Sequence, residues 1–251
     1  MKVNIFSVRD SIDSFEIIKN LEKSGVKANS LSIVKTNYKN IPNFRLKYDF
    51  IVLTSSKSVK SFLQYIKLYK RHFLKIPKVF IVGPETGKKL KINNFFKFHQ
   101  ALGNTKSLIK VILSNTKIYN KGLWLCGKNR NNQFKDNLLK RKRFLKTTVV
   151  YDMFQKDIIS EHLIKKLKKQ EKKYFLVNSS RNVSILTMLL KKYNLFDNLK
   201  KNTILVTMSK KIYDRAVIDG WENIQVIAEV SRELFLCKFI NSLNFKEKNN
   251  G

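Results

Sequence analysis

Short runs rich in β-branched and aromatic residues recur along the chain, and each is followed by a turn residue and then by a longer stretch with helical spacing. Ten runs have this character, at residues 3–8, 31–34, 50–53, 79–82, 98–102, 123–126, 148–151, 174–177, 203–207 and 224–227. Such alternation is typical of parallel α/β units. Ten strands are too many for one tidy doubly wound sheet in a chain of this length, so we expect two smaller parallel sheets.

The clearest helical pattern lies at residues 57–70, where lysines alternate with apolar side chains. The apolar positions there are Val59, Phe62, Leu63, Ile66 and Tyr69. Spacing of three and four residues predicts a helix with one buried stripe and a solvated lysine face.

An internal echo indicates two like units. Residues 48–56 resemble residues 172–180 at an offset of 124, and each segment reads as a buried strand that ends in hydroxyl side chains. A valine follows in both copies, Val59 and Val183, and residues 79–83 recur as 204–208 at nearly the same offset. No linker rich in Gly, Ser or Pro separates the copies, so we expect a short, structured connection.

The composition describes a folded protein with a very basic surface. The chain has 251 residues, with 51 Lys and Arg against 18 Asp and Glu, a net charge of +33, yet 43% of its residues are hydrophobic. A disordered basic tail lacks such apolar content. Only 9 of the basic residues are Arg, so much of the charge is consistent with compositional drift, although a polyanionic ligand is compatible with it.

The sequence offers no metal, disulfide or membrane signal. The two cysteines lie far apart, the three histidines lack zinc-ligand spacing, and no apolar run approaches the length needed to span a bilayer. The amino-terminal residues also lack the apolar core of a signal peptide. We therefore expect a cytoplasmic protein without a metal or a membrane partner.

Hydroxyl and glycine residues follow the predicted strands at the edge where open α/β sheets bind ligands. These segments are Thr54-Ser55-Ser56, Gly83-Pro84-Glu85-Thr86, Gly103-Asn104-Thr105, Gly127, Ser179-Ser180 and Ser209. Hydroxyls and free N–H groups at helix starts suit carboxylate or phosphate groups. For any single one of these residues, a helix cap is the simpler interpretation. Capping alone does not explain the same hydroxyl pair at equivalent strand ends in two units.

Residues 83–89 superficially resemble a phosphate loop, but the glycine spacing is one residue short. Lys89 stands where a magnesium-binding hydroxyl is needed, and Glu85 would repel phosphate. No dinucleotide fingerprint and no GxSxG motif is present. The sequence therefore does not support nucleoside triphosphate binding, an activated serine or a common cofactor.

A series of short motifs extends over nearly the whole chain. In order they are Val8-Arg9, Asp49 with Thr54-Ser55 and Val59, Val82-Gly83 with Thr86, Leu102-Gly103, Leu125-Cys126-Gly127 with Arg130, Val150-Tyr151, Ser179 with Val183, Met208-Ser209 and Gly220-Trp221. Their order and spacing, together with the chain length, resemble the uroporphyrinogen-III synthase family.

The resemblance implies two small parallel-sheet α/β domains joined by a two-stranded connector, with the active site in the interdomain cleft. It implies one discontinuous domain of residues 1–34 and 154–251 and a second domain of residues 37–149. Residues 35–36 and 150–153 would form the connector.

The implied reaction cyclises hydroxymethylbilane to uroporphyrinogen III, with loss of water and inversion of the terminal pyrrole ring. This substrate carries eight carboxylates, which would account for a basic site lined with N–H and hydroxyl donors. The resemblance implies no cofactor, and we expect a monomer. Uncatalysed closure gives the other isomer, so orientation of the substrate would be the enzyme's main task.

The resemblance also implies the site residues. Tyr151 is the candidate general acid for the departing hydroxyl, and the alternative for it is a strand tyrosine with its ring in the core. The candidate substrate-binding residues are Arg9, Thr54, Ser55, Gly83, Thr86, Gly103, Gly127, Ser179, Ser180, Ser209 and Lys210. Some relatives have a threonine where this chain has Ile212, so backbone donors around Ser209 and Lys210 would serve there.

Two other functions compete with this hypothesis. The charge of +33 raises a non-catalytic, nucleic-acid-binding α/β protein, but the sequence does not gather Arg and aromatic residues on one face, as stacking on bases requires. We therefore expect no specific nucleic-acid partner. The second alternative is a two-lobed binding protein for a small anion, which a missing signal sequence disfavours.

Overall fold

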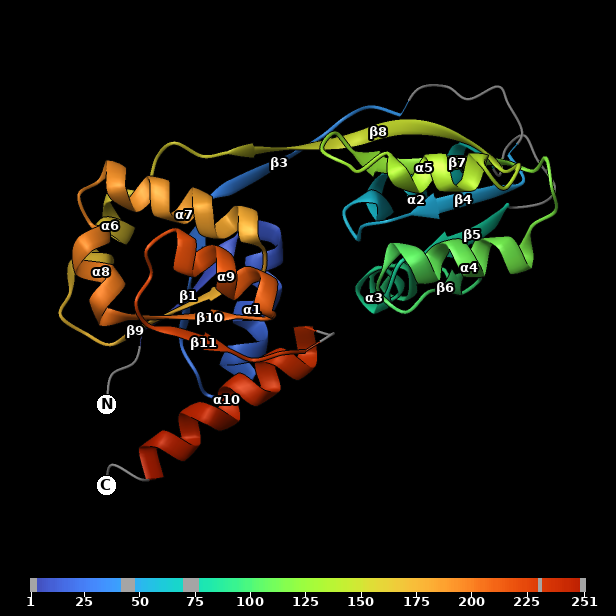
Figure 1. Ribbon diagram of the computed structural model, residues 1–251. Coiled ribbons are helices and arrows are strands. Elements are labelled where there is room, and N and C mark those ends of the chain that lie inside the picture. Colours follow the sequence, from blue (N-terminus) through green and yellow to red (C-terminus); the bar gives the residue numbers. More distant parts are fainter. Residues whose placement is uncertain (1–3, 42–47, 70–76, 230–231, 249–251) are drawn as a thin grey trace. The chain divides into compact units, whose positions relative to one another are not determined.

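The computed structural model describes residues 4–41, 48–69, 77–229 and 232–248, and the chain divides into two compact units (Figure 1). Unit 1 comprises Met1–Lys35 with Phe154–Gly251, and unit 2 comprises Thr36–Met153. Each unit is built on its own sheet with helices packed against it, so the prediction of two parallel-sheet α/β units is confirmed. Val3, which was predicted to begin the first strand, lies outside the described residues.

Unit 1 contains a five-stranded sheet in which every strand pairs in parallel. The order across the sheet is β11 (Ile224–Val226), β10 (Thr203–Thr207), β9 (Lys173–Val177), β1 (Asn4–Arg9) and β2 (Ala28–Ser32). The helices of this unit are α1 (Ser11–Lys23), α6 (Glu161–Lys168), α7 (Ser180–Lys192), α8 (Phe196–Asn202), α9 (Lys210–Ile218) and α10 (Arg232–Lys248).

Helices cover both faces of the sheet in unit 1. On one face, Leu21 of α1 and Phe239 of α10 are fully buried in a shared apolar cluster. On the other face, next to α7, the rings of Phe6 and Trp221 each meet Phe175 edge to face, with centroids 5.5 and 5.9 Å apart. Strands covered in this way are apolar on both sides, which explains why they read as continuous hydrophobic runs.

Unit 2 contains a six-stranded sheet. The order is β3 (Val34–Tyr38), β8 (Phe144–Gln155), β7 (Lys121–Gly127), β4 (Phe50–Leu53), β5 (Lys78–Ile81) and β6 (His99–Gln100), and the five strands from β8 to β6 pair in parallel. The helices are α2 (Ser58–Tyr69), α3 (Pro84–Ile92), α4 (Thr105–Asn115) and α5 (Gln133–Leu139).

Helix α2 has the pattern that the sequence predicts at residues 57–70. Val59, Phe62 and Ile66 are at most 6% exposed and pack in the apolar cluster on one face of the sheet, whereas Lys60 and Lys67 are exposed. The predicted buried stripe is confirmed at these positions. The side chain of Tyr69 and all of Lys70 lie outside the described residues.

The prediction of one strand at residues 31–34 is wrong. The segment contributes to two strands, because Leu31 pairs with Val8 of β1 while β3 begins at Val34 beside β8. The change of partner occurs at Ile33, whose N–H donates to the carbonyl of Arg9 at 3.2 Å and whose carbonyl accepts from the N–H of Lys156 at 2.9 Å. An apolar run reports burial, but it does not specify the strand with which each residue pairs.

Strand β8 is far longer than the predicted run at residues 148–151, and it has β3 as a hydrogen-bonded neighbour. The N–H of Lys39 donates to the carbonyl of Val150 at 2.9 Å, and the N–H of Lys156 donates to the carbonyl of Ile33 at 2.9 Å. Both bonds fit one antiparallel register. In that register Tyr38 stands opposite Tyr151. The role of these strands as a connector between domains stays a prediction.

Two buried serines on α2 allow a matched test of how this helix is held on the sheet. Ser58 is fully buried, and its hydroxyl donates to the carbonyl of Leu125 in β7 at 2.8 Å. Ser61 is 1% exposed, and within the described structure its hydroxyl has no hydrogen-bond partner. We expect Ser58→Ala to lower the free energy of unfolding by about 1–3 kcal/mol and Ser61→Ala to leave it unchanged or raised. Chemical denaturation measures both values, and equal losses would contradict the prediction.

Candidate active site

The sheet topology defines one point in each unit where a ligand can reach the carboxyl ends of the strands. In unit 1 the chain continues from β1 to β2 on one side, whereas β9 lies on the other side of β1, so the loops diverge between β1 and β9. In unit 2 the loops diverge between β4 and β7 for the same reason. Such switch points are where open α/β sheets bind ligands. Predicted site residues stand at both, with Arg9 and Ser179 in unit 1 and Thr54 and Gly127 in unit 2.

The loop after β4 uses most of its polar groups to start α2. The Ser55 hydroxyl accepts from the N–H of Lys57 at 3.2 Å, and the N–H groups of Ser58 and Val59 donate to the carbonyls of Ser55 and Ser56. Thr54 differs, because its hydroxyl oxygen accepts from the indole N–H of Trp124 at 3.0 Å. That bond holds the side chain in place while its own hydroxyl proton can still be donated.

Gly83 and Gly103 bring the loops after β5 and β6 together. A Cβ on Gly83 would lie 3.2 Å from the Cα of Gly103, so the two backbones approach closely. Gly103 has a φ of +82°, and its N–H donates to the carbonyl of Val82 at 2.8 Å. Thr86 lies in α3 and is only 2% exposed. The two glycines shape this loop pair, and the hydroxyl of Thr86 belongs to the interior of unit 2.

Gly127 and Tyr151 form the closest contact at the end of β7. A Cβ on Gly127 would lie 2.7 Å from Cζ and 2.9 Å from the hydroxyl oxygen of Tyr151, so the ring lies directly over the glycine. A bulge brings them together, because Cys126 pairs with Val149 whereas Gly127 pairs with Tyr151. The N–H of Lys128 donates to the carbonyl of Tyr151 at 3.0 Å. Only glycine at residue 127 allows this position of the ring.

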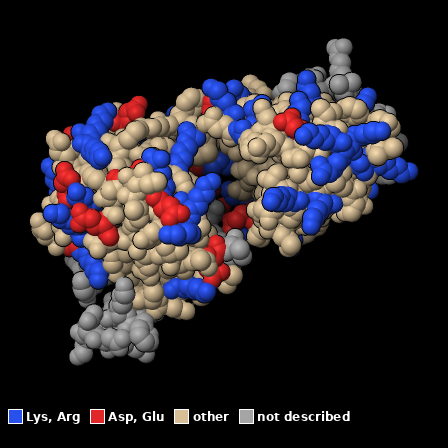
Figure 2. Space-filling model, viewed as in Figure 1, with Lys and Arg blue, Asp and Glu red and all other residues tan. Residues whose placement is uncertain are grey.

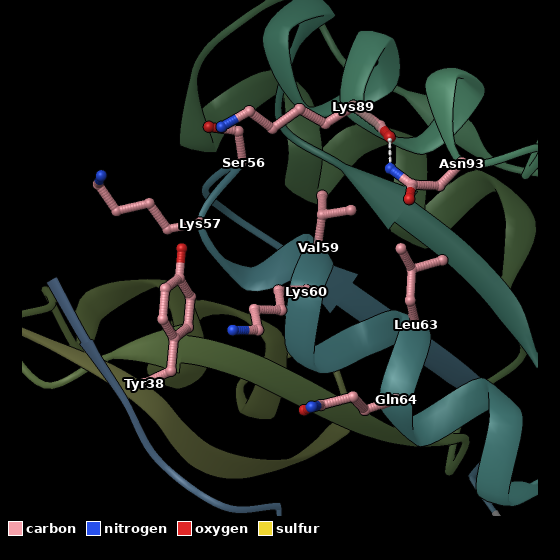
Figure 3. A pocket seen from close by; sticks show the side chains of 9 residues that line it. All are labelled: Tyr38, Ser56, Lys57, Val59, Lys60, Leu63, Gln64, Lys89 and Asn93. Atoms are coloured by element: carbon pink, nitrogen blue, oxygen red, sulfur yellow. Dashed lines mark hydrogen bonds between the residues drawn. The ribbon is translucent and has the colours of Figure 1, made fainter. Parts of the chain in front are cut away.

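A hollow of about 390 Å³ opens between α2, α3 and the end of β3 in unit 2 (Figure 3). Three of the nine residues that line it are lysines, Lys57, Lys60 and Lys89, and none is acidic. Tyr38 contributes its ring, and Lys60 Nζ lies 4.8 Å from the centroid of that ring. Since Tyr38 stands opposite Tyr151 in the β3–β8 register, the hollow adjoins the part of β8 that carries Tyr151.

At the switch point of unit 1, Arg9 and two aspartates form a partly buried group. The Arg9 guanidinium lies 3.2 Å from the carboxylate of Asp13, and the two side chains are 12% and 6% exposed. Asp10 caps α1 by accepting from the N–H of Asp13 at 2.8 Å. Arg9 therefore already has a carboxylate partner inside its own unit.

The serine pair after β9 is also engaged locally. Ser179 caps α7 by accepting from the N–H of Asn182 at 3.1 Å, and Ser180 donates to the carbonyl of Lys211 at 3.3 Å. Asn182 in turn donates to the carbonyl of Val8 at 3.2 Å, which ties α7 to the end of β1. Beside them, Asn178 Oδ1 is buried and has no hydrogen-bond partner within the described part of the chain.

Ser209 precedes α9 without a side-chain cap bond, and its carbonyl accepts from the N–H groups of Ile212 and Tyr213. Lys210 is exposed and lies 2.9 Å from the carboxylate of Asp214, and this hydrogen bond raises the pKa of the lysine. Its Nζ also lies 4.3 Å from the centroid of the Tyr213 ring. Ile212 is 7% exposed and supports the helix from inside.

The charge is distributed unequally between the units. The sequence of unit 2 carries 26 Lys and Arg against 4 Asp and Glu, a net charge of +22, and that of unit 1 carries 25 against 14, a net charge of +11. On the face drawn in Figure 2, Asp and Glu are correspondingly more frequent over unit 1 than over unit 2. The basic potential is therefore strongest in the unit that contains Tyr151 and the hollow.

Metal binding, a reactive buried thiol and a membrane-spanning helix were also sought among the residues that the structure describes. Their His, Cys, Asp and Glu side chains form no group of three that could hold a metal ion. Cys126 is buried, and this burial raises the pKa of its thiol to about 11, so the thiol stays protonated at neutral pH. None of the helices in the described ranges combines the length and apolarity needed to cross a bilayer.

Sequence reasoning missed four residues of these edges: Tyr38, Lys60, Lys89 and Asn178. Lys60 was assigned to a solvated face, Lys89 was considered only as part of the rejected phosphate loop, and Tyr38 lay in no predicted strand. Asn178 occurred in the internal echo, where only the serines beside it drew attention. Tyr38 could be found only from the pairing of β3 with β8. These strands are far apart in the sequence, so no local pattern predicts that they pair.

The chain matches the family model of uroporphyrinogen-III synthase HemD over residues 16–233. Among solved structures it is similar to uroporphyrinogen-III synthetase from Helicobacter pylori, with a TM-score of 0.64 and 17% identity over 96% of this chain and 100% of that one. It is also similar to a mutant uroporphyrinogen III synthase from Thermus thermophilus, with a TM-score of 0.59 and 14% identity over 98% and 100% of the two chains. At these identities the likeness shows a shared fold. No curated protein sequence matches the chain.

Ser179 and Ser209 provide a matched test of capping at the edge of unit 1. Both precede a helix, but only Ser179 accepts a side-chain cap bond. We expect Ser179→Ala to lower the free energy of unfolding by about 1 kcal/mol and Ser209→Ala to lower it by a few tenths at most. Urea denaturation of both variants checks this difference. A larger loss for Ser209→Ala would mean that the caps are misassigned.

Proposed function

The chain belongs to the uroporphyrinogen-III synthase family, and on this premise we propose that the carboxyl edges of its two sheets hold hydroxymethylbilane while the ring closes. The protein is a cyclising lyase that converts this linear tetrapyrrole to uroporphyrinogen III, with loss of water and inversion of the terminal pyrrole ring. The position of Tyr151 over Gly127, beside a hollow with three lysines, is the observation that carries the proposal. The interdomain cleft stays a prediction.

Substrate charge supports a site that includes the edge of unit 2. Eight carboxylates need cations and hydrogen-bond donors, and unit 2 has a net charge of +22. The hydroxyl of Thr54 is a positioned donor, because Trp124 holds its oxygen. Gly83, Gly103 and Gly127 would keep backbone close to the substrate, while Ser55 and Thr86 would act by holding the loops that carry these donors.

The edge of unit 1 would contribute further polar contacts. Lys210 is exposed, and the hydroxyls of Ser179, Ser180 and Ser209 lie at helix starts where anions bind favourably. Arg9 would act mainly by holding the turn after β1, because its guanidinium is paired with Asp13. Asn178 Oδ1 is a buried acceptor, and the pyrrole N–H groups of the substrate are donors that could satisfy it.

Tyr151 would act as the general acid. As the carbon–oxygen bond of the substrate's hydroxymethyl group breaks, the phenol gives its proton to the departing oxygen, and water leaves. Ring closure then releases a proton from the substrate, which restores the phenol, so no cofactor is required. Because the uncatalysed reaction gives the other isomer, holding the substituted ring carbon closest to the reacting carbon is the larger part of the task.

The same chemistry supports proposals for the oligomeric state, the location and the nucleic-acid binding of the protein. A monomer is sufficient, because every proposed contact comes from one chain, and a cytoplasmic location suits an enzyme of this pathway. Nucleic acid would bind only through diffuse charge, without sequence selectivity and with steep loss in salt.

Tyr151→Phe tests the acid directly. We expect this variant to keep its fold and most of its substrate affinity while cyclisation slows by about 10²–10⁴-fold, because the phenol proton is lost. The enzyme should still form the inverted isomer, since the substrate is held in the same geometry. Single-turnover kinetics with isomer analysis measures both. A variant as fast as wild type would remove Tyr151 from the mechanism, and one that unfolds would assign it to the core.

Gly127→Ala tests the position of the Tyr151 ring while the tyrosine itself is kept. The new methyl group would overlap the ring, so we expect kcat to fall by about 10²-fold with little change in melting temperature. Gly122→Ala on the same strand is the control, because its methyl group would meet Phe50 in the core at 2.3 Å. That variant should lose about 1–3 kcal/mol of stability and keep its kcat. Unchanged kcat in Gly127→Ala would contradict the assignment.

A further inference from the structure

The hollow in unit 2 has two chemical sides (Figure 3). Lys57, Lys60 and Lys89 contribute three amines, whereas Val59 and Leu63 contribute an apolar wall. Its volume of about 390 Å³ falls in the range of sites that enclose small molecules. A flat apolar ring that carries a carboxylate would match both sides.

Lys60 and Lys89 approach the hollow in different ways. Lys60 Nζ lies 4.8 Å from the centroid of the Tyr38 ring, close enough for a cation–π interaction. Lys89 lies in α3, where the side-chain amide of Asn93 donates to its carbonyl at 2.8 Å, and in Figure 3 its side chain extends toward Ser56. The amines therefore reach the hollow from two different helices, α2 and α3.

The hollow is also adjacent to the proposed chemistry. Tyr38 stands opposite Tyr151 in the antiparallel register of β3 and β8, and side chains opposite one another in such a pair lie on the same face of the sheet. Tyr151 packs against the apolar cluster that includes Val59 of α2, and Val59 also lines the hollow together with Tyr38. A group seated in the hollow is thus held next to the candidate acid.

We propose that this hollow is a subsite for one pyrrole ring of the tetrapyrrole, with the carboxylate side chains of that ring bound by Lys60 and Lys89. The inference rests on the proposed function, because it takes the substrate from it. It adds a defined place for one ring and assigns substrate contacts to Tyr38, Lys60 and Lys89. A phosphate ion shares the anionic chemistry but lacks the apolar ring that Val59 and Leu63 would contact.

The test compares two double variants that remove the same charge from the same two helices. Lys60→Gln with Lys89→Gln removes amines of the hollow, and Lys67→Gln with Lys91→Gln removes exposed amines of α2 and α3 outside it. We expect the first double variant to raise KM for hydroxymethylbilane about tenfold, the loss of roughly one charge-assisted hydrogen bond, with kcat within about twofold of wild type. The second should change KM less than twofold.

A direct binding measurement separates this inference from the proposed function. Fluorescence titration with uroporphyrin I, an octacarboxylate, should give about tenfold weaker binding in the first double variant and wild-type binding in the second. Equal affinities in both variants, with synthase activity intact, would overturn the subsite alone. A wild-type protein without synthase activity would overturn the proposed function. The titration would still show whether Lys60 and Lys89 bind a tetrapyrrole carboxylate. If inorganic phosphate displaced uroporphyrin I from the wild-type protein at concentrations where propionate has no effect, the assignment of the hollow to a carboxylate would be overturned.

Discussion

Parallel pairing of strands that are buried on both faces is the constraint from which the rest of this structure follows. Every residue of β4 and of β9 is buried, because helices cover both faces and other strands lie on both sides. Such strands can present polar groups only at their ends. Since parallel strands all end at one edge, the candidate hydroxyls of both units and the candidate glycines of unit 2 lie there. The reversal of strand order selects β1–β9 and β4–β7 as the places where a ligand can enter.

Two glycines on β7 connect the core of unit 2 with its chemistry. At Gly122 the missing side chain leaves space for the ring of Phe50 inside the sheet, and at Gly127 it leaves space for the ring of Tyr151 at the edge. The same lack of a Cβ serves packing at one end of the strand and, in our proposal, the position of an acid at the other. The bulge between Cys126 and Gly127 brings Tyr151 opposite Gly127.

The excess of positive charge is concentrated in unit 2, which suggests a role for part of it. A net charge of +22 on unit 2 opposes its own folding through repulsion, and a substrate with eight carboxylates would relieve that repulsion on binding. The proposed ring subsite gives part of this charge a position, because Lys60 and Lys89 approach one hollow from two helices. Other lysines, such as Lys67 and Lys91, lie exposed outside it, which is consistent with compositional drift over much of the surface.

Much of this fold could be predicted from the sequence because burial is a local property of side chains. Alternating runs predicted two parallel α/β units, the spacing around Val59 and Phe62 predicted α2, and the internal echo located hydroxyls at equivalent strand ends. Pairing is not local, and only the tertiary structure decided it. It divided residues 31–34 between two sheets at Ile33, and it brought Tyr38 opposite Tyr151 across more than a hundred residues of sequence. The hollow between α2 and α3 followed from that pairing, because a side chain becomes part of a site only when the sheet determines which neighbours it faces.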